Sequence, residues 1–230
     1  MDKNLCIIPV RGGSKGIPGK NARKIYKNIS LLEWTINQAK SAFPLNNIFV
    51  STEDHELKNI TLNNGIFLVN RPMELATDDA TTASVVKHLL KEVDFKCERF
   101  NSITILQVTS PLRQKKDILN ALNMINQENY DSVLSVYKSD NSAAKTYILE
   151  EGNAKSLLPN YEFLSRQKLP IFYRRNGAIF SVKRELFDLT GKLWGGDLGL
   201  VIMEKERSID IDNFEDLENA RKYLNNYQEK

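Results

Sequence analysis

Short apolar segments alternate with segments of helical periodicity along most of this 230-residue chain, and this alternation limits its possible folds most strongly. Helical spacing of apolar residues covers 31–43, 54–64, 81–93 and 117–126, and a last helix is expected after Asn213. Strand-like runs cover residues 5–10, 48–52, 66–69, 103–108, 132–136, 177–182 and 209–212. Such alternation is typical of a mostly parallel sheet flanked by helices. We therefore predict an α/β fold.

Size and composition exclude several classes of protein. A chain of 230 residues is long enough for one α/β domain, with or without a small inserted lobe. No apolar run approaches the ~18 residues of a membrane span, so we expect no membrane partner. The first residues lack the apolar core of a signal peptide, which favours the cytoplasm. The net charge of +3 is small and its cations are scattered, so nucleic acid is not expected as a partner.

A glycine-rich and cationic segment, from Arg11 to Asn21, follows the first strand. Glycine lets the backbone approach a ligand closely, and the cations suit an anion, so the segment predicts a polyphosphate cradle. It is not a P-loop, which needs glycine at Ser14 and Ser or Thr at Asn21. It is not a dinucleotide fingerprint either, because Gly12 and Gly13 are adjacent. A nucleotidyltransferase-type loop remains, with a flexible turn carrying solvated lysines as the alternative.

A second polar segment, residues 107–113, follows the strand at 103–108. Open α/β sheets bind ligands beyond the carboxyl ends of their strands, where this loop and the glycine-rich segment both emerge. Gln107 and Ser110 carry groups that can read the edge of a base, and Arg113 can meet phosphate or carboxylate. A Ser-Pro turn is common by itself. The prediction of a ligand-binding loop therefore rests on the combination of Gln107, Ser110 and Arg113.

Asp210 and Asp212 alternate with isoleucines near the C-terminus. On a strand, this spacing directs both carboxylates to one face and both isoleucines to the core. Two adjacent oxygen ligands suit Mg²⁺, which completes its shell with water and substrate phosphates. The alternative is a solvent-exposed strand face that ends in a helix cap.

Periodicity weakens between residues 139 and 175, which predicts an insertion or subdomain. The end of this segment, together with Asn176 directly after it, combines cations with hydrogen-bonding side chains. These residues are Arg166, Gln167, Tyr173, Arg174, Arg175 and Asn176. A planar guanidinium is a natural partner of a carboxylate substrate. At least one of the two adjacent arginines is expected to be solvated instead.

The string IPVRGGSKGIPGKN at residues 8–21 resembles the acylneuraminate cytidylyltransferase family, the CMP-sialic acid synthetases. Further blocks match in order at residues 51–54, 71–78, 107–113, 166–178 and 207–212, so the resemblance covers essentially the whole chain. It implies one Rossmann-like domain over residues 1–230 and a homodimer. It also implies a small dimerisation lobe at about residues 139–173.

The resemblance implies a reaction of CTP with a nine-carbon 2-keto sugar acid, giving the CMP-sugar and pyrophosphate. The implied nucleotide-binding residues are Arg11, Gly12, Ser14, Lys15, Lys20, Asn21, Arg71, Thr81 and Ser84. Those implied for the sugar acid are Gln107, Thr109, Arg113, Lys145, Arg166, Gln167, Tyr173 and Asn176, with Lys145 and Arg166 reaching from the partner subunit. Asp210 and Asp212 are expected to hold Mg²⁺, and Lys20, Asp210 and Arg11 to be catalytic. Either Asp210 accepts the proton of the attacking hydroxyl directly, or the metal lowers the pKa of that hydroxyl; the sequence leaves both routes open.

Two positions depart from the family pattern. Arg175 stands where the family more often has Glu, and Lys168 stands where it commonly has Asp. Legionaminic acid is therefore an alternative to N-acetylneuraminic acid, ahead of pseudaminic and 3-deoxy-octulosonic acids. Two alternative functions belong to other classes of protein: a non-catalytic nucleotide-binding module and a glycosyltransferase. Lys20, Asp210 and Asp212 argue against the module, and a glycosyltransferase predicts its Asp-x-Asp directly after a central strand.

Overall fold

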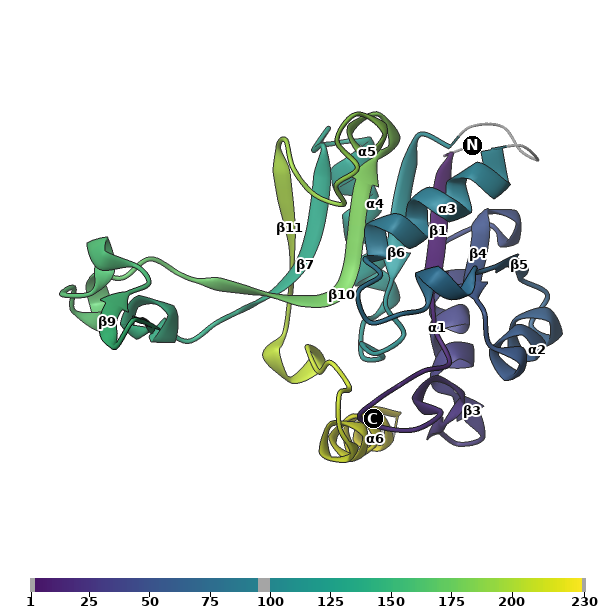
Figure 1. Ribbon diagram of the computed structural model, residues 1–230, viewed down its shortest axis with the longest axis horizontal. Helices are drawn as coiled ribbons and strands as arrows, with labels where there is room; N and C mark the ends of the chain where they lie inside the picture. The colour runs from purple at the N-terminus through teal and green to yellow at the C-terminus, as the bar shows by residue number, and fades with distance from the viewer. Residues whose placement is uncertain (1–2, 95–99, 229–230) are drawn as a thin grey trace.

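A seven-stranded sheet of order β11-β7-β10-β6-β1-β4-β5 forms the centre of the computed structural model, which describes residues 3–94 and 100–228 (Figure 1). Its strands are β1 (Asn4–Pro9), β4 (Ile48–Thr52), β5 (Phe67–Asn70), β6 (Ser102–Leu106), β7 (Ser132–Lys138), β10 (Tyr173–Lys183) and β11 (Leu198–Met203). β10 is antiparallel to β6 and β7, whereas the other paired strands of this sheet are parallel. The predicted mostly parallel α/β sheet is confirmed.

Helices cover both faces of this sheet, and the side chains of β1 alternate between them. Cys6 and Ile8 pack in the cluster that includes α1 (Leu31–Lys40), α2 (His55–Asn63), α4 (Lys115–Asn126) and α6 (Phe214–Gln228). Leu5 and Ile7 face the other way, against α3 (Thr82–Asp94) and α5 (Arg184–Thr190). Burial on both faces explains why β1 is a continuous apolar run.

Helix α1 begins as its sequence predicts. The backbone N–H of Glu33 donates to Ser30 Oγ at 3.2 Å, and the Ser30 N–H donates to Glu33 Oε2 at 2.7 Å. This capping box satisfies two amides that the helix cannot pair internally. It fixes the point where the chain leaves the small hairpin β2 (Lys24–Tyr26) and β3 (Ile29–Ser30) and turns back along the sheet.

The strand predicted at residues 209–212 is wrong. The segment joins no sheet, and its Ile211 N–H donates to the Thr109 carbonyl at 2.8 Å. Its alternation survives because Ile211 is buried and Asp212 is exposed. The missed strand is β11, which leaves Leu198, Leu200 and Ile202 exposed on one face and therefore lacks a polar alternation.

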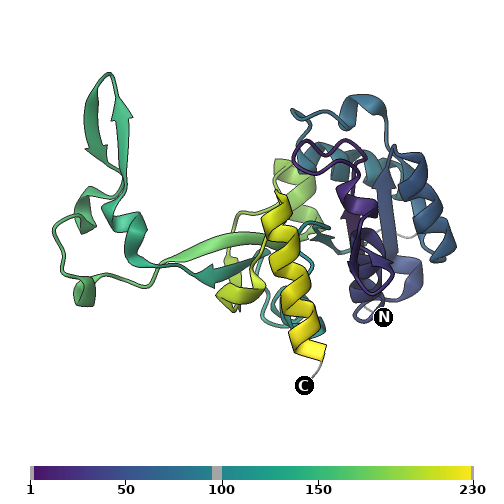
Figure 2. The ribbon, with the colours of Figure 1, turned by 90° about the horizontal axis from the view of Figure 1, so that it is seen from below.

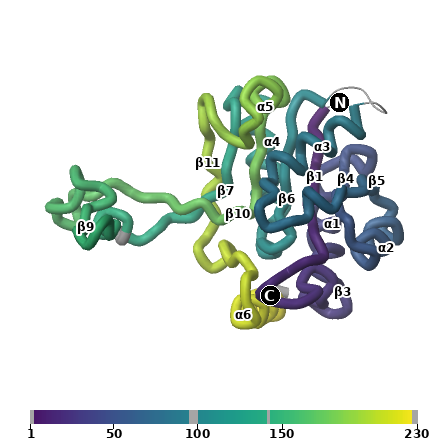
Figure 3. Tube along the Cα trace, viewed as in Figure 1, coloured from purple at the N-terminus to yellow at the C-terminus, as the bar shows by residue number. Residues whose placement is uncertain are grey.

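An arm projects from the body where β7 and β10 run past the sheet (Figures 1 and 2). It spans residues 139–172 and carries the hairpin β8 (Tyr147–Glu150) and β9 (Asn153–Ser156), with three 3₁₀ turns at Asn141–Lys145, Pro159–Tyr161 and Arg166–Lys168. The tube view follows a single excursion of the chain out to this arm and back (Figure 3). Within the described ranges, no helix is both long and apolar enough to cross a membrane.

Candidate active site

A cavity of about 390 Å³ lies at the carboxyl end of β1 and β6. The Val10 N–H donates to the Ser51 carbonyl at 3.0 Å, so the chain leaves β1 beside the end of β4. The cavity is lined by six of the residues predicted to bind nucleotide: Arg11, Ser14, Lys15, Lys20, Asn21 and Arg71. The structure therefore gathers the glycine-rich segment and a residue that follows β5 around one space.

Close packing explains two glycines of this segment. A Cβ on Gly12 would lie 2.4 Å from Asp54 Oδ2, and one on Gly16 would lie 2.1 Å from the Asp212 carbonyl oxygen. The Gly12 N–H also donates to Glu53 Oε1 at 2.7 Å. Gly12 therefore packs against Glu53 and Asp54. It does not line the cavity, although it was predicted to contact nucleotide.

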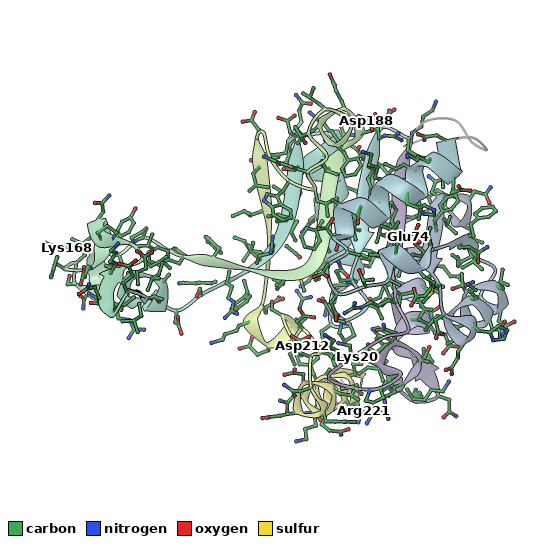
Figure 4. All side chains as sticks on the ribbon, in the orientation of Figure 1. Lys20, Glu74, Lys168, Asp188, Asp212 and Arg221 are labelled. Atoms are coloured by element: carbon green, nitrogen blue, oxygen red, sulfur yellow. The ribbon has the colours of Figure 1, made fainter. Side chains whose placement is uncertain are left out.

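Lys20 is buried at the junction of the glycine-rich segment and the C-terminal segment. Its ammonium donates to the Ile211 carbonyl and lies 3.8 Å from Asp212 Oδ1. Figure 4 shows the two labelled residues side by side at the end of the molecule where α6 lies. A cation with 8% exposure beside a carboxylate is a fixed charge at the wall of the cavity.

Arg11 and Lys15 converge on Asp78, a residue without a predicted role. Arg11 Nη2 lies 2.8 Å from Asp78 Oδ1, and Lys15 Nζ lies 2.5 Å from Asp78 Oδ2. Hydrogen bonds from Lys15 and Arg11 lower the pKa of Asp78. Since all three side chains line the cavity, they bridge the glycine-rich segment and the loop before α3.

Arg71 is buried and lines the same cavity. Its Nη2 donates to the Ser51 carbonyl at 2.7 Å, and burial lowers its pKa to about 10 although Glu53 opposes this shift. Thr81 and Ser84 lie further away: the Ser84 hydroxyl donates to the Thr81 carbonyl at 2.7 Å, and neither residue lines this cavity. Their neighbours Ala80 and Thr82 do.

A second, polar cavity of about 740 Å³ adjoins the first and shares Gln107, Thr109 and Asp212 with it. Asp210 lines this polar cavity. Burial raises the pKa of Asp210, a hydrogen bond from Thr109 partly lowers it, and the negative charge of Asp212 raises it again. Ligands in the two cavities would therefore meet at Gln107, Thr109 and Asp212.

Two residues predicted to bind the sugar acid are engaged inside the protein. Asn176 lines the polar cavity, but its Oδ1 accepts from Ser135 Oγ at 2.6 Å and its Nδ2 donates to Ser208 Oγ at 2.9 Å. Arg113 is a correction: it is 2% exposed, and it donates to the Ala178 carbonyl at 2.7 Å and the Gln107 carbonyl at 2.6 Å. Arg113 therefore supports the loop from the interior and does not line the cavity.

Four predicted sugar-acid residues lie outside the cleft of their own chain. Lys145 donates to the Glu162 carbonyl within the arm, while Arg166 and Gln167 line a separate hollow of about 560 Å³ at the base of the arm. Tyr173 begins β10 there. Figure 4 shows Lys168, their neighbour, far from Lys20 and Asp212.

The carboxylates predicted to hold Mg²⁺ fit that role in part. Asp210 and Asp212 both line the polar cavity, and Asp212 also lines the first. Among the described residues, no group of three or more acidic, histidine or cysteine side chains is arranged to hold a metal. Two carboxylates suffice for Mg²⁺ only where phosphate and water complete the shell, and these two border the predicted phosphate cradle.

Residues outside the predicted substrate-binding set also line the polar cavity. Tyr137 and Arg174 face each other as paired residues of β7 and β10, and Ser208 and Asp216 come from the C-terminal segment. Only the two adjacent arginines gave a signal in the sequence. The others become visible only when β7, β10 and the C-terminal segment are brought together.

A cationic glycine-rich loop after the first strand, next to a polar cavity with two carboxylates, defines an α/β site of the nucleotidyltransferase type. The family model described as Cytidylyltransferase matches residues 5–229, and the chain belongs to this family of nucleotidyltransferase enzymes.

Two relatives support this assignment, and one solved structure shares the fold. The chain is 30% identical over 216 residues to post-translational flagellin modification protein B of Campylobacter coli, covering 93% of this chain and 91% of that protein. It is 33% identical over 217 residues to N-acylneuraminate cytidylyltransferase of Streptococcus agalactiae serotype V, but spans only 51% of that protein. The fold matches CMP:2-keto-3-deoxy-manno-octonic acid synthetase, solved with CTP, with a TM-score of 0.72, 16% identity and coverage of 98% and 100% of the two chains.

Proposed function

We propose that this cytidylyltransferase couples CTP to a nine-carbon 2-keto sugar acid of the N-acetylneuraminic or legionaminic type, releasing pyrophosphate. The observation that carries the proposal is the contact between the two cavities at Gln107, Thr109 and Asp212. The relatives named N-acylneuraminate cytidylyltransferase support the choice of acid. The alternative acids are pseudaminic and 3-deoxy-octulosonic acid.

The nucleotide occupies the smaller cavity in this proposal. Arg11 and Lys15 exchange Asp78 for the triphosphate, because their guanidinium and ammonium groups border the cavity on its cationic side. Lys20, buried and held by the Ile211 carbonyl, presents a fixed positive charge to the phosphates. Fixed charges of this kind stabilise a transition state without reorganisation of solvent.

The sugar acid occupies the polar cavity, with its anomeric hydroxyl beside Asp210. The hydroxyl oxygen forms a bond to the α-phosphorus while the bond from that phosphorus to the bridging oxygen breaks, and pyrophosphate leaves. The hydroxyl proton passes to the Asp210 carboxylate, whose raised pKa suits a general base. Thr109 holds this carboxylate through its hydrogen bond.

Asp210 and Asp212 are the residues that would hold Mg²⁺. When bound, the ion supplies positive charge to the phosphate oxygens and the leaving pyrophosphate. The Gly16 backbone packs against the Asp212 carbonyl, so the main chain at Asp212 is held next to the glycine-rich segment.

We further infer that a second copy of the chain completes the polar cavity with its arm. The arm exposes several large apolar side chains: Tyr147, Ile148, Leu149, Leu157, Phe163 and Ile171. It also carries Lys145, Arg166 and Gln167, which do not line the cleft of their own chain. A homodimer would bury the first group and bring the second to a cleft.

Pyrophosphate release from CTP with a panel of sugar acids tests the function. We expect turnover with N-acetylneuraminic or legionaminic acid in the presence of Mg²⁺, and no turnover without an acid. Absence of CTP turnover with every acid of the panel would refute the proposal. If CTP is turned over only with 3-deoxy-octulosonic acid, the substrate is this eight-carbon acid and not a nine-carbon one.

A further inference from the structure

Arg113 is an almost fully buried cation whose hydrogen-bond acceptors, among the described residues, are all neutral. Its Nη1 donates to the Ala178 carbonyl at 2.7 Å, and its Nη2 donates to the Gln107 carbonyl at 2.6 Å. Gln38 Oε1 accepts from its Nε at 3.1 Å, and Thr35 Oγ1 accepts from its Nη2 at 3.3 Å. The described part of the chain places no carboxylate within ion-pair distance of this guanidinium.

Arg207, a second buried arginine that holds the same loop, is balanced by acids. It donates to the Leu112 carbonyl at 3.2 Å, and its Nη1 lies 2.6 Å from Asp117 Oδ2. Glu204 is a further carboxylate partner of this guanidinium. Taking an unbalanced charge out of water is unfavourable, so a balanced pair of this kind would suffice if the loop only had to be held in place. The unbalanced charge of Arg113 therefore calls for a second explanation.

The charge of Arg113 persists at neutral pH and lies directly behind the cleft. Burial lowers the pKa of Arg113 to about 9, although the charge of Asp117 opposes this shift, so the guanidinium remains protonated. Gln107, whose carbonyl it binds, lines both the nucleotide cavity and the polar cavity. A charge inside a protein acts more strongly than one in water, because the effective dielectric constant around it is lower. Arg113 thus adds positive potential to both cavities.

Three cations that line the nucleotide cavity are, by contrast, already paired with acids. Arg11 and Lys15 share Asp78, and Lys20 lies 3.8 Å from Asp212. A bound phosphate has to compete with these carboxylates at the wall of the cavity. It has no such competitor for the buried guanidinium behind the loop, which forms no ion pair with a described carboxylate.

We propose that Arg113 is a buried counter-charge for the anionic substrates, acting from behind residues 107–113 without touching a ligand. Its hydrogen bond polarises the peptide that joins Gln107 to Val108. The carbonyl and the N–H of a trans peptide point in opposite directions, so the Val108 N–H points away from Arg113. Val108 lines the nucleotide cavity, and its N–H has no acceptor among the described residues. This inference rests on the proposed function, since it assumes that a nucleoside triphosphate occupies that cavity.

The test compares binding of cytidine, CMP and CTP, which share base and sugar but differ in negative charge. Dissociation constants are measured by calorimetry without Mg²⁺, which would mask phosphate charge, and the weakest ligand is measured by competition with CTP. Arg113→Met removes the buried charge. We expect affinity to fall by less than about twofold for cytidine, about threefold for CMP and about tenfold or more for CTP. An equal loss for all three ligands would indicate a purely structural role and would overturn the inference.

A second variant neutralises the charge while Arg113 stays in place, so the test does not depend on how the fold tolerates its removal. Gln38→Glu puts a carboxylate where Gln38 Oε1 already accepts from Arg113 Nε. Gln38→Met is the matched control, because it also loses the two hydrogen bonds that the Gln38 amide donates but adds no charge. Gln38→Glu should bind CTP about fivefold more weakly than Gln38→Met and cytidine equally well. Equal CTP affinity in the two variants would overturn the inference.

Ionic strength separates a buried charge from an exposed one. Salt screens exposed charges strongly and buried charges much less. Lys15, whose side chain is 83% exposed, supplies the comparison. The loss of CTP affinity in Lys15→Met should shrink between about 0.05 M and about 0.5 M salt, whereas the loss in Arg113→Met should persist. Equal shrinkage of the two losses would overturn the inference.

These binding measurements separate failure of this inference from failure of the proposed function. If the nucleotides bind with the expected dependence on charge but no sugar acid is turned over, the counter-charge stands and the transfer reaction falls. If turnover proceeds but Arg113→Met loses the same affinity for all three ligands, the transfer reaction stands and the counter-charge falls. A wild type that binds CTP no more tightly than cytidine would also overturn the counter-charge.

Discussion

Lys20 Nζ lies 3.8 Å from Asp212 Oδ1, which places the most buried cation of the glycine-rich segment against the predicted metal-binding pair. The contact joins the first strand's loop to the segment that precedes the last helix. The predicted phosphate cradle and the segment that carries the two carboxylates are therefore held together, through the Lys20–Asp212 ion pair and the close approach of Gly16 to the Asp212 carbonyl.

Lys20→Ala should lower kcat by about 10²–10³-fold, the loss typical of one preorganised group that stabilises charge in a transition state. Steady-state pyrophosphate release measures it. Lys87→Ala, which removes the same group from the exposed face of α3, is the matched control and should retain wild-type activity. An unchanged rate in Lys20→Ala would remove this residue from the catalytic set.

Asp78→Asn should tighten CTP binding by up to about fivefold, because exposed ion pairs contribute about 0–1 kcal/mol and the variant frees Arg11 and Lys15. Titration calorimetry with CTP gives the dissociation constant. Asp79→Asn makes the same chemical change one residue along the chain and should have a smaller effect. Weaker binding in Asp78→Asn would mean that Asp78 positions the two cations for the ligand instead of competing with it.

Asp117→Asn should destabilise the fold by about 1.5–3 kcal/mol, because the buried Arg207 loses charge-assisted hydrogen bonds and keeps only the more exposed Glu204 as a charged partner. Arg207 Nη1 lies 2.6 Å from Asp117 Oδ2, and both side chains are almost fully buried. Urea denaturation measures the loss in the free energy of unfolding. Glu218→Gln, at an exposed pair with Arg221, is the comparison and should cost about 0–1 kcal/mol; an equal cost at both sites would contradict the argument.

Acid should remove a stabilising contribution from Glu204. Burial alone would raise the pKa of this carboxyl, but hydrogen bonds and the charge of Arg207 outweigh burial and lower it to about 2. Because the folded-state pKa is depressed, the contribution is complete above the unfolded pKa of about 4.3 and is lost as pH falls toward 2.

Urea denaturation of the wild type and Glu204→Gln tests this pH dependence. The difference in the free energy of unfolding should be constant from pH 7 to about pH 5 and should shrink below that. A difference that does not change with pH would assign the effect of the variant to lost hydrogen bonds rather than to the charge.

Phe163→Glu should shift the protein toward monomers, because this side chain is 91% exposed on the arm that we place in a dimer interface. Sedimentation velocity over a range of protein concentrations measures the assembly state. Leu189→Glu, 83% exposed on α5, is the matched control and should leave assembly unchanged. A wild type that is monomeric at all concentrations would refute the role of the arm.

The sequence predicts the layered fold well because its signals are local. Ser30 and Glu33 stand three residues apart ahead of an apolar stripe, and the capping box forms as this spacing predicts. The glycine-rich segment is likewise readable, since it directly follows a strand and combines glycines with cations. These features depend on neighbours in the chain, which a sequence displays directly.

Arg113 and Asp78 depend instead on tertiary packing, which the sequence does not display. Arg113 follows a strand end like a ligand-binding arginine, but the Ala178 carbonyl on β10 lies within its reach and turns it inward. Asp78 receives its role from cations more than 60 positions away in the chain. The sequence also does not show that the arm lies far from the cleft of its own chain. The residue types in the arm do not indicate whether they contact the cleft of their own chain or that of another copy.

β10 is one strand that runs from Tyr173, at the base of the arm, through Arg175 and Asn176 into the core of the sheet, with a shift of its register against β7 between Arg175 and Phe180. Subunit association and sugar binding would therefore act on the same strand. Thermodynamic linkage then requires each to change the free energy of the other by an equal amount. The affinity for the sugar acid then depends on enzyme concentration. Dilution should weaken binding of the acid before it weakens binding of CTP.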